Sequence, residues 1–306
     1  MWAVHRLVSG WNRFDPRGRD PVQRGHTVNA NPWLSHPAVI EEIHPEIESV
    51  ATLILRLEDS NLAASYRFAP GQFNMLYVPG CGEVAISMSG PATENGDRIV
   101  HTIRTVGRVT QAIEQLGVGQ VIGVRGPLGT PWPIESLYDR DVVLVSGGLG
   151  MAPLRPVIYE LMREPYRFGR RTLLFGARSP DLILYGDEIE SWRALGIEVQ
   201  LTVDRADEGW HGHVGTVPLL IDRLAGLDPS RTAMLVCGPE VMMHFSAKSG
   251  LARGLPRESI WLSMERNMQC AFGMCGHCQW GSHFVCRNGP VLRYDTAEPF
   301  LWVRDL

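Results

Sequence analysis

Four of the chain's six cysteines lie close together, at Cys270, Cys275, Cys278 and Cys286. Neighbouring thiolates can hold a tetrahedral metal ion or an iron–sulfur cluster. Structural zinc usually takes two short cysteine pairs that lie far apart in sequence. Here three cysteines share one loop, and their Cys-x4-Cys-x2-Cys spacing is typical of plant-type [2Fe–2S] proteins. The spacing therefore predicts a [2Fe–2S] cluster on the four thiolates; a zinc site and four reduced structural cysteines are the alternatives.

The residues between these cysteines suit a tightly curled loop. Gly273 and Gly276 lack side chains, so the loop can bend until its backbone N–H groups face the sulfurs. His277 lies between two of the expected ligands and would itself bind metal only if a cysteine were spared. We therefore place it beside the cluster rather than on it.

A glycine-rich turn follows the apolar segment 141–148 and leads into an expected helix over 153–164. It contains Gly147, Gly148 and Gly150, with Pro153 where a dinucleotide fingerprint has its third glycine. A strand–turn–helix of this kind places a pyrophosphate on the orphan N–H groups of a helix N-terminus. Proline is favourable at a first helical position. The alternative is an ordinary turn between a strand and a helix, many of which contain glycine.

Cys237 and Gly238 end the fourth strand expected in this half of the chain. Ligands of open α/β sheets bind at the carboxyl ends of the strands. This position predicts that Cys237 faces a cofactor crevice. The alternative is a small buried residue beside the start of a helix.

The N-terminal half offers a weaker pattern. Ser87 belongs to a strand over 83–89 that ends in hydroxyl groups, and Gly107 and Thr110 open a short helix over 110–117. A helix start of this kind can bind an anion, with Thr110 as the expected N-cap. Ordinary strand and capping chemistry is the alternative for both.

The chain divides into four stretches, which indicate the elements that must position these residues. Residues 1–38 are rich in proline, glycine and arginine without a clear period, and we expect an N-terminal extension. Residues 39–136 contain six short β-branched segments bounded by turn residues, which predict an antiparallel barrel. Residues 137–264 alternate strands with helices, which predicts a parallel sheet covered on both faces. Residues 265–306 hold the cysteine cluster and are too short for a domain of their own.

Composition excludes several classes of protein. Lys and Arg number 29 and Asp and Glu 33, a net charge of −4, so bulk charge gives no surface for nucleic acid. With 44% hydrophobic and 20% charged residues the chain is globular rather than disordered. No apolar run is long enough to span a membrane. The first residues carry charges, so we expect no secretory signal and a reducing cytoplasm; an arginine-rich transit peptide over residues 1–31 is the alternative.

In this order, the glycine-rich turn, the run that begins at Cys237 and the four-cysteine tail resemble the ferredoxin–NADP reductase superfamily. The resemblance covers residues 31–292. It is closest to the electron-transfer subunits that end in a [2Fe–2S] loop, namely those of dihydroorotate dehydrogenase B and the gamma (diaphorase) subunits of nickel–iron hydrogenases and sulfhydrogenases. Residues 31–34 (Asn-Pro-Trp-Leu) and the segment from Glu265 to Pro290 favour the hydrogenase type.

The resemblance implies an antiparallel flavin-binding β-barrel over 39–136, a parallel-sheet NAD(P)-binding α/β domain over 137–264 and a C-terminal [2Fe–2S] segment. Ser87 would lie near the flavin nitrogen that accepts hydride, and Cys237 and Gly238 would border the nicotinamide. The remaining implied contacts are Ile86, His101, Ile103 and Arg104 for the flavin ring, Gly107 and Thr110 for the flavin phosphates, and Gly147, Gly148, Gly150 and Pro153 for the dinucleotide pyrophosphate. The superfamily's R-x-[YF]-S flavin motif is absent, since its arginine and aromatic positions are Val84 and Ile86. We expect FAD, with FMN as the alternative.

The choice of nucleotide is left open by the sequence. Asp204 follows the third expected strand of the α/β half, where an acidic side chain suits the ribose of NAD. Arg178 and Arg205 fall close by in the pattern and could bind the extra phosphate of NADP. We therefore expect NAD(P).

The function implied is electron transfer between NAD(P)(H) and a partner redox subunit of a larger complex. A nicotinamide moves hydride, a [2Fe–2S] centre moves single electrons, and a flavin can do both and so must lie between them. The hydrogenase gamma subunit is the leading interpretation. Alternatives are a dihydroorotate dehydrogenase subunit, a reductase that serves an oxygenase, and a non-catalytic nucleotide-binding subunit with a structural zinc site. No nucleic acid or membrane partner is expected.

Overall fold

The computed structural model of the chain describes residues 31–92, 98–301 and 303. The extension expected over 1–38 therefore lies, as far as residue 30, outside the described residues. No helix of the described part is both long and apolar enough to span a bilayer.

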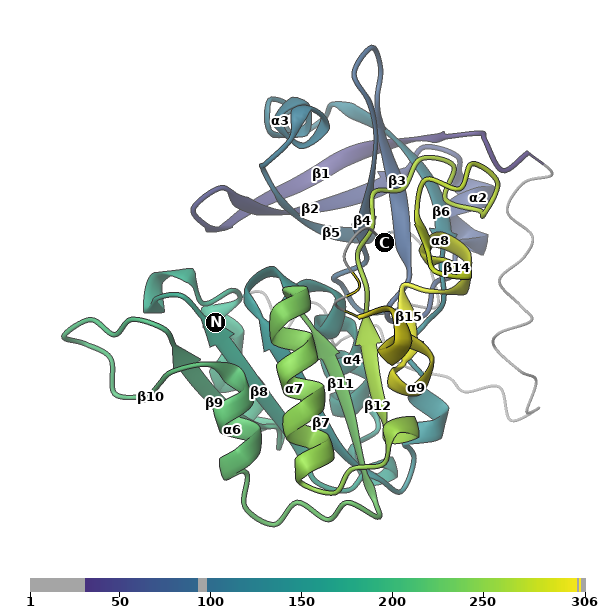
Figure 1. Cartoon of the computed structure of the whole chain (residues 1–306). Coiled ribbons are helices and arrows are strands. Elements are labelled where there is room, and N and C mark those ends of the chain that lie inside the picture. Colours follow the sequence, from purple (N-terminus) through teal and green to yellow (C-terminus); the bar gives the residue numbers. More distant parts are fainter. Residues whose placement is uncertain (1–30, 93–97, 302, 304–306) are drawn as a thin grey trace.

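The N-terminal half is an antiparallel sheet of six strands in the order β4-β3-β6-β1-β2-β5 (Figure 1). A bridge between Met88, just beyond β4, and His101 of β5 joins the two edges and closes the barrel. The alternating apolar side chains of the strands fill its interior. The strands are β1 (His36–Ile47), β2 (Val50–Leu57), β3 (Phe73–Val78), β4 (Gly82–Ser87), β5 (Ile99–Arg104) and β6 (Val121–Leu128), with helices α2 (Ser60–Ser65) and α3 (Arg108–Glu114).

Helix α3 starts two residues earlier than predicted. Gly107 is its N-cap, and Thr110 is the third helical residue. The Thr110 hydroxyl accepts the backbone N–H groups of Val106 and Gly107, at 3.0 and 2.9 Å. The prediction that Thr110 is the N-cap is wrong, because a side chain in the first turn can reach back to the N–H groups that precede the helix.

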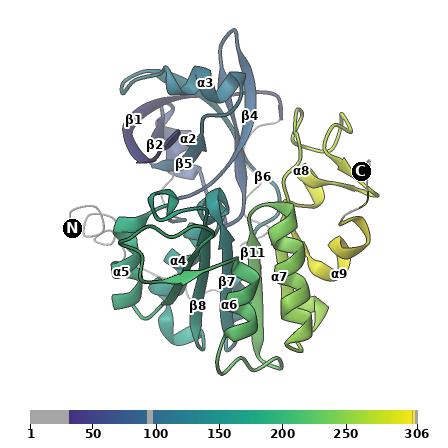
Figure 2. The ribbon, with the colours of Figure 1, turned by 60° about the vertical axis from the view of Figure 1, so that its left-hand side comes forward.

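The second half is a seven-stranded sheet in the order β10-β9-β8-β7-β11-β12-β15. All neighbouring strands are parallel except β15, which runs antiparallel to β12. Helices α4 and α5 pack on one face of the sheet, and α6 and α7 on the other (Figure 1 and Figure 2). The parallel sheet with helices on both faces is thus confirmed. The elements are β7 (Asp141–Gly147), α4 (Met151–Arg163), β8 (Arg171–Ala177), α5 (Ile189–Ala194), β9 (Glu198–Val203), β10 (His213–Val214), α6 (Val217–Arg223), β11 (Thr232–Cys237), α7 (Glu240–Ala252) and β12 (Ile260–Ser263).

The cysteine segment lies against both halves (Figure 2). Its elements are β13 (Gln279–Trp280), β14 (His283–Phe284), α8 (Val285–Asn288), β15 (Val291–Arg293) and α9 (Tyr294–Ala297). Through β15 it extends the second sheet. Its buried residues Ala271, Cys278 and Cys286 share one core with Phe73 and Met75 of barrel strand β3. The cysteine segment is therefore held by the barrel and by the α/β sheet together.

Candidate functional site

A cleft of ≈ 1050 Å³ opens at the carboxyl ends of β7, β8, β9 and β11, where the α/β half meets the barrel. The predicted site residues that line it are Gly147, Gly148, Gly150, Arg178, Asp204, Gly238 and Arg104. The first six come from the α/β half, and Arg104 comes from barrel strand β5. The structure thus brings six of the predicted nucleotide residues together with one predicted flavin residue, whereas Pro153 and Cys237 do not line the cleft.

The glycine-rich turn forms one 3-10 turn, Gly148–Gly150, that runs directly into α4 without a side-chain cap. Gly148 has φ +53°, which favours glycine, and a Cβ built there would have no neighbour within 4 Å. Helix α4 has 13 residues, and no side chain caps its N-terminus. Orphan N–H groups at the start of such a helix bind anions. The geometry of the turn is therefore suited to binding a pyrophosphate.

Position 150 requires glycine because of a long-range contact that the sequence did not predict. A Cβ at this position would lie 2.2 Å from the carbonyl oxygen of Cys237 and 2.6 Å from the backbone nitrogen of Gly238. The turn is thus pressed against the end of β11, and Gly150 is required by this backbone contact. Pro153 is buried in the first turn of α4 and does not line the cleft; its main-chain carbonyl accepts the indole N–H of Trp132 at 3.0 Å.

Cys237 does not line the cleft, although it was expected to face it. Its side chain is 2% exposed and packs in the core on the α4 face of the sheet. Burial raises the pKa of its thiol far above the usual range, so the group stays protonated. Its neighbour Gly238, with φ +155°, forms part of the cleft wall. A role of Cys237 at the nicotinamide remains a prediction.

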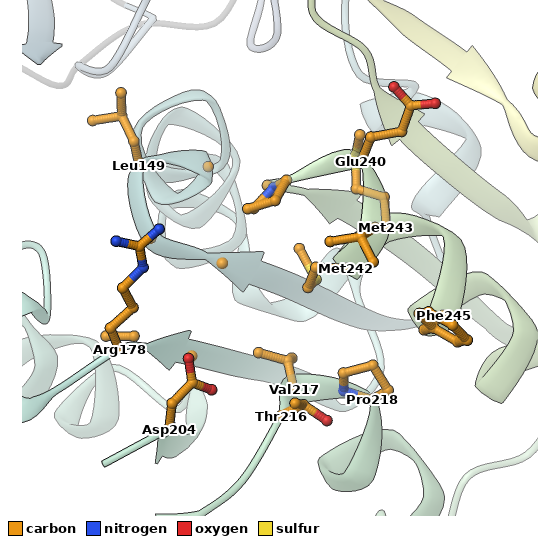
Figure 3. A pocket seen from close by; sticks show the side chains of 18 of the residues that line it. Leu149, Arg178, Asp204, Thr216, Val217, Pro218, Glu240, Met242, Met243 and Phe245 are labelled. Carbon is orange, nitrogen blue, oxygen red and sulfur yellow. The ribbon is translucent and has the colours of Figure 1, made fainter. Parts of the chain in front are cut away.

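Arg178 and Asp204 stand next to each other at one end of the cleft (Figure 3). Each follows the end of a parallel strand, and the backbone N–H of Asp204 donates to the carbonyl of Ala177 at 3.0 Å. Arg205 is exposed and is not part of the cleft wall. The pair places a carboxylate and a guanidinium where they could recognise the ribose of a dinucleotide or a phosphate on that ribose.

Several lining residues were not predicted. Met242 and Phe245 of α7 lie across the cleft from Arg178 (Figure 3). Lys248 of α7 and Glu265, two residues beyond β12, also line the cleft. Partial desolvation raises the pKa of the Glu265 carboxyl, although its side chain still reaches solvent. The rule that ligands meet strand ends would have found Glu265, as it found Asp204.

The predicted flavin residues divide into accessible and buried ones. Ile86, Ser87 and Arg104 retain exposed surface, and Gly107 has open space beside it. His101 and Ile103 are inside the barrel, with 0% and 3% exposure. Their side chains are therefore not available to a flavin on the barrel surface, and a contact there would use their main chain. The Thr110 hydroxyl is likewise buried and satisfied within its own turn.

His101 is neutral and links three strands, since it lies on β5, Ser87 on β4 and Asn74 on β3. Its Nδ1 lies 2.9 Å from the carbonyl oxygen of Ser87, and its Nε2 lies 3.0 Å from the amide nitrogen of Asn74. Because a carbonyl can only accept, the proton belongs on Nδ1. Burial lowers the pKa of His101 to about 4, so the ring is uncharged at neutral pH. It holds Ser87 at the end of β4.

The cysteine loop is curled as its glycines predict, with Gly273 at φ +81° and Gly276 at φ +75°. Backbone N–H groups point at the sulfurs. Those of Met274 and Cys275 donate to Cys270 Sγ at 3.3 and 3.4 Å, and that of Gly273 donates to Cys286 Sγ at 3.1 Å. Such donors stabilise thiolates and tune iron–sulfur clusters.

The pKa shifts of the loop differ between its cysteines, because burial and the neighbouring Cys278 side chain raise the pKa of the Cys286 thiol to about 12, whereas the pKa of Cys270 is lowered. Burial raises the pKa of the Cys270 thiol, but hydrogen bonds from the backbone of Cys275, Phe272 and Met274 outweigh it and lower the pKa to about 6. Cys270 hydrogen-bonds the Cys275 side chain, and Cys286 that of Cys278. Two neighbouring pairs suit a [2Fe–2S] cluster, in which each iron takes two protein ligands.

The exposure of the four cysteines and the residues near them give further evidence on the loop. Among the described residues no three His, Cys, Asp or Glu side chains gather around one metal-ion position. His277 shares a hydrogen bond of 3.1 Å with Asn267. Cys275 is exposed, whereas the other three cysteines are buried. The donor set fits the cluster that the spacing predicts, with Cys275 on its outer side.

Comparison with known proteins gives a consistent result. Residues 144–248 match the oxidoreductase NAD-binding domain, and residues 265–297 match the iron–sulfur cluster binding domain of dihydroorotate dehydrogenase B. The chain is 33% identical to the sulfhydrogenase 1 gamma subunit of Pyrococcus furiosus, with 87% of this chain and 93% of the relative covered. It is 30% identical to a probable dihydroorotate dehydrogenase B electron transfer subunit of the same organism, with 80% and 87% covered.

Solved structures share the fold. One is an NADH-dependent reduced ferredoxin–NADP oxidoreductase, with a TM-score of 0.68, 24% identity and coverage of 88% of this chain and 94% of that one. Another is a ferredoxin–NADP⁺ reductase from Neisseria gonorrhoeae, with a TM-score of 0.64, 19% identity and coverage of 74% and 97%. Both therefore share the overall fold of this chain.

Proposed function

We propose, from the premise that this chain belongs to the family of sulfhydrogenase gamma subunits and dihydroorotate dehydrogenase B electron-transfer subunits, that it is the diaphorase (gamma) subunit of a nickel–iron hydrogenase. The chain is an NAD(P)H-dependent flavin and iron–sulfur oxidoreductase subunit. What is proposed beyond this is the kind of complex in which it works, the residues that serve it and its place in the cytoplasm.

One observation carries the proposal: a nucleotide cleft and a cluster loop are packed on the same barrel in one chain. The cleft lies on the side of Arg104, and the cysteine loop lies on the side of Phe73 and Met75. The hydrogenase assignment is supported by the similarity to two sulfhydrogenase gamma subunits, 33% and 32% identical. It is also supported by contact between the segments that favoured this type, since the Trp33 and Phe272 rings stack edge to face at 4.6 Å.

The chain's own residues divide the work by position. The turn of Gly147, Gly148 and Gly150, which leads into α4, holds the dinucleotide pyrophosphate, because backbone N–H groups at an uncapped helix start and the helix dipole attract anions. Asp204 accepts hydrogen bonds from the adenosine ribose, and Arg178 supplies a positive charge for a 2′-phosphate, so both NAD and NADP are proposed. Gly238 borders the nicotinamide, with Cys237 behind it.

The barrel and the tail hold the other two cofactors, which we propose to be FAD and [2Fe–2S]. A flavin bound there would supply both two-electron chemistry toward a nicotinamide and one-electron chemistry toward a [2Fe–2S] cluster. Ser87, held by His101, and Ile86 present the end of β4 to the ring, and Gly107 presents the start of α3 to the phosphates. The four cysteines bind the cluster, and no acid–base group is needed. β1 begins at His36, inside the extension expected over 1–38, so that boundary is corrected. We propose 36–136, 137–264 and 265–306 as the three functional segments.

The second candidate is the electron-transfer subunit of a dihydroorotate dehydrogenase, which the match over 265–297 favours. Purification of the native complex and identification of its partner subunits by mass separates the two. The proposal expects a nickel–iron hydrogenase subunit and hydrogen-dependent reduction of NAD(P)⁺. Copurification of a dihydroorotate-oxidising subunit, without hydrogen-dependent activity, would contradict the proposal.

A further inference from the structure

Arg125 of β6 is a buried arginine with every N–H group in use. Its side chain is 4% exposed. Nε and Nη2 donate to the two carboxylate oxygens of Glu83, at 3.2 and 2.8 Å, in a bidentate pair. Nη1 donates to the carbonyl of Cys270 at 2.8 Å and to that of Pro32 at 3.2 Å, and Nη2 also reaches the carbonyl of Gln269 at 3.4 Å. One side chain thus joins three segments that are far apart in sequence.

The geometry of the barrel explains how these groups meet. In the sheet β3 lies between β4 and β6, with Met75 opposite both Arg125 and Ala85. Glu83 is two residues before Ala85 and therefore points to the same face. That face carries Met75 and Ala85 against Ala271 of the cysteine loop. Arg125 and Glu83 consequently span the surface on which the loop rests.

The partners of Arg125 belong to two predicted cofactor sites. Glu83 is the second residue of β4, the strand whose other end, Ser87, belongs to the predicted flavin site. Cys270 is the first predicted ligand of the cluster, and its carbonyl is gripped directly. A buried ion pair contributes little net stability compared with apolar residues of similar volume. Stability alone therefore does not explain a full positive charge at this place.

We propose that Arg125, paired with Glu83, is a positioning residue that fixes the cluster loop on the flavin strand and sets the reduction potential of the cluster. This inference rests on the proposed function, since it assumes that the four cysteines bind a redox-active cluster. A cluster gains one negative charge on reduction, and nearby net charge is one determinant of its potential. The guanidinium favours the reduced form, and the Glu83 carboxylate opposes it.

The two members of the pair therefore predict opposite shifts. Arg125→Gln removes the positive charge and leaves Glu83 unpaired, so the cluster becomes harder to reduce. Glu83→Gln removes the negative charge and leaves the arginine in place, so the cluster becomes easier to reduce. We expect a change of about tenfold in the one-electron reduction equilibrium in each direction, which corresponds to about 59 mV.

The test is an anaerobic redox titration of the reconstituted full chain, with the cluster followed by electron paramagnetic resonance and the iron content measured. Arg125→Lys keeps the charge but not the bidentate fork, so its potential stays near that of the wild type while its iron content falls. Arg56→Gln is the matched control, because Arg56 forms an exposed pair with Glu41 in the same barrel. Its potential and iron content should be unchanged.

Opposite shifts for Arg125→Gln and Glu83→Gln support the inference. Potentials that stay at the wild-type value, or that move in the same direction, overturn it. Should Arg125→Gln take up no iron, an unshifted Glu83→Gln potential overturns the inference, and a raised one supports it. A wild-type chain that binds no cluster overturns the proposed function and this inference with it, whereas a normal wild-type cluster with unmoved variants overturns this inference alone.

Discussion

Gly148 and Gly150 stand two residues apart in the nucleotide turn, and we predict that a methyl group at each has a different effect. At Gly150 the added Cβ would lie 2.2 Å from the Cys237 carbonyl oxygen and 2.4 Å from its carbonyl carbon. Ordinary contacts begin near 3.4 Å, and both neighbours are backbone atoms that cannot rotate away. At Gly148 the Cβ would meet nothing within 4 Å.

The magnitudes follow from these contacts. Gly150→Ala forces the end of β11 away from the turn, and overpacking of this kind costs about 3 kcal/mol of unfolding free energy. The midpoint of thermal unfolding should fall by about 6–12 °C. Gly148→Ala costs only about 1 kcal/mol, because a non-glycine residue must adopt φ +53°. Its methyl group instead occupies the space over the helix start, so the KM for NAD(P)H should rise strongly.

The assay is a pair of measurements on each variant, thermal unfolding and NAD(P)H oxidation with an artificial acceptor. Gly186→Ala is the control, because Gly186 lies in the same half, has an ordinary φ and has no neighbour within 4 Å of its Cβ position. A Gly150→Ala chain as stable as the control would refute the packing that we describe. An unchanged KM in a stable Gly148→Ala chain would remove the turn from the nucleotide site.

Three further predictions concern other parts of the chain. His101 has a pKa of about 4 in the folded state against 6.5 for the free side chain, so the unfolded chain binds the extra proton first. His101 should therefore contribute about 3 kcal/mol of unfolding free energy above pH 6.5, and this contribution should be lost as the pH falls to 4. His101→Gln should remove this pH dependence of the unfolding free energy. Parallel pH profiles of the two proteins in denaturant titrations would contradict the prediction. Arg155→Met should lower the unfolding free energy by about 3–5 kcal/mol in the same titrations, because the Glu188 carboxylate, only 16% exposed, would lose its charged partner. The double variant Arg155→Met/Glu188→Gln should recover part of that stability. A loss below about 0.5 kcal/mol in the single variant would show that the pair does not stabilise the fold. Cys275→Ser should lose most of its iron and the cluster absorption but keep flavin and NAD(P)H oxidation by an artificial two-electron acceptor; a variant that retains two irons per chain would show that Cys275 is not a ligand.

Local patterns in the sequence were sufficient for the elements. The apolar segment expected to end in the glycine turn, 141–148, is β7 (Asp141–Gly147), and the turn opens α4 as predicted. The spacing of the cysteines and glycines between Cys270 and Cys286 predicted a curled loop with N–H groups directed at the sulfurs, and the structure has it. These features depend on neighbours a few residues apart, which a single sequence shows directly.

Long-range contacts could not be read in the same way. Arg125 binds the carbonyl of Cys270, which is 145 residues away, and no local pattern marks it. The burial of His101 depends on strand pairing, since its side chain points into a barrel that closes through the Met88–His101 bridge and the hydrogen bond from Ser89 to Val100. The need for glycine at position 150 comes from β11, which follows about 80 residues later in the chain. Each of these depends on packing between elements rather than on the type of the residue.

The central claim is that one chain takes hydride from NAD(P)H and delivers single electrons to a [2Fe–2S] cluster held by Cys270, Cys275, Cys278 and Cys286. The most direct measurement is an anaerobic titration of the purified chain with NAD(P)H, followed by visible absorption and by low-temperature electron paramagnetic resonance. We predict that the flavin absorption bleaches and that the signal of a one-electron-reduced cluster grows with the added nucleotide. A colourless protein, or a cluster that stays oxidised while the flavin is fully reduced, would contradict the claim.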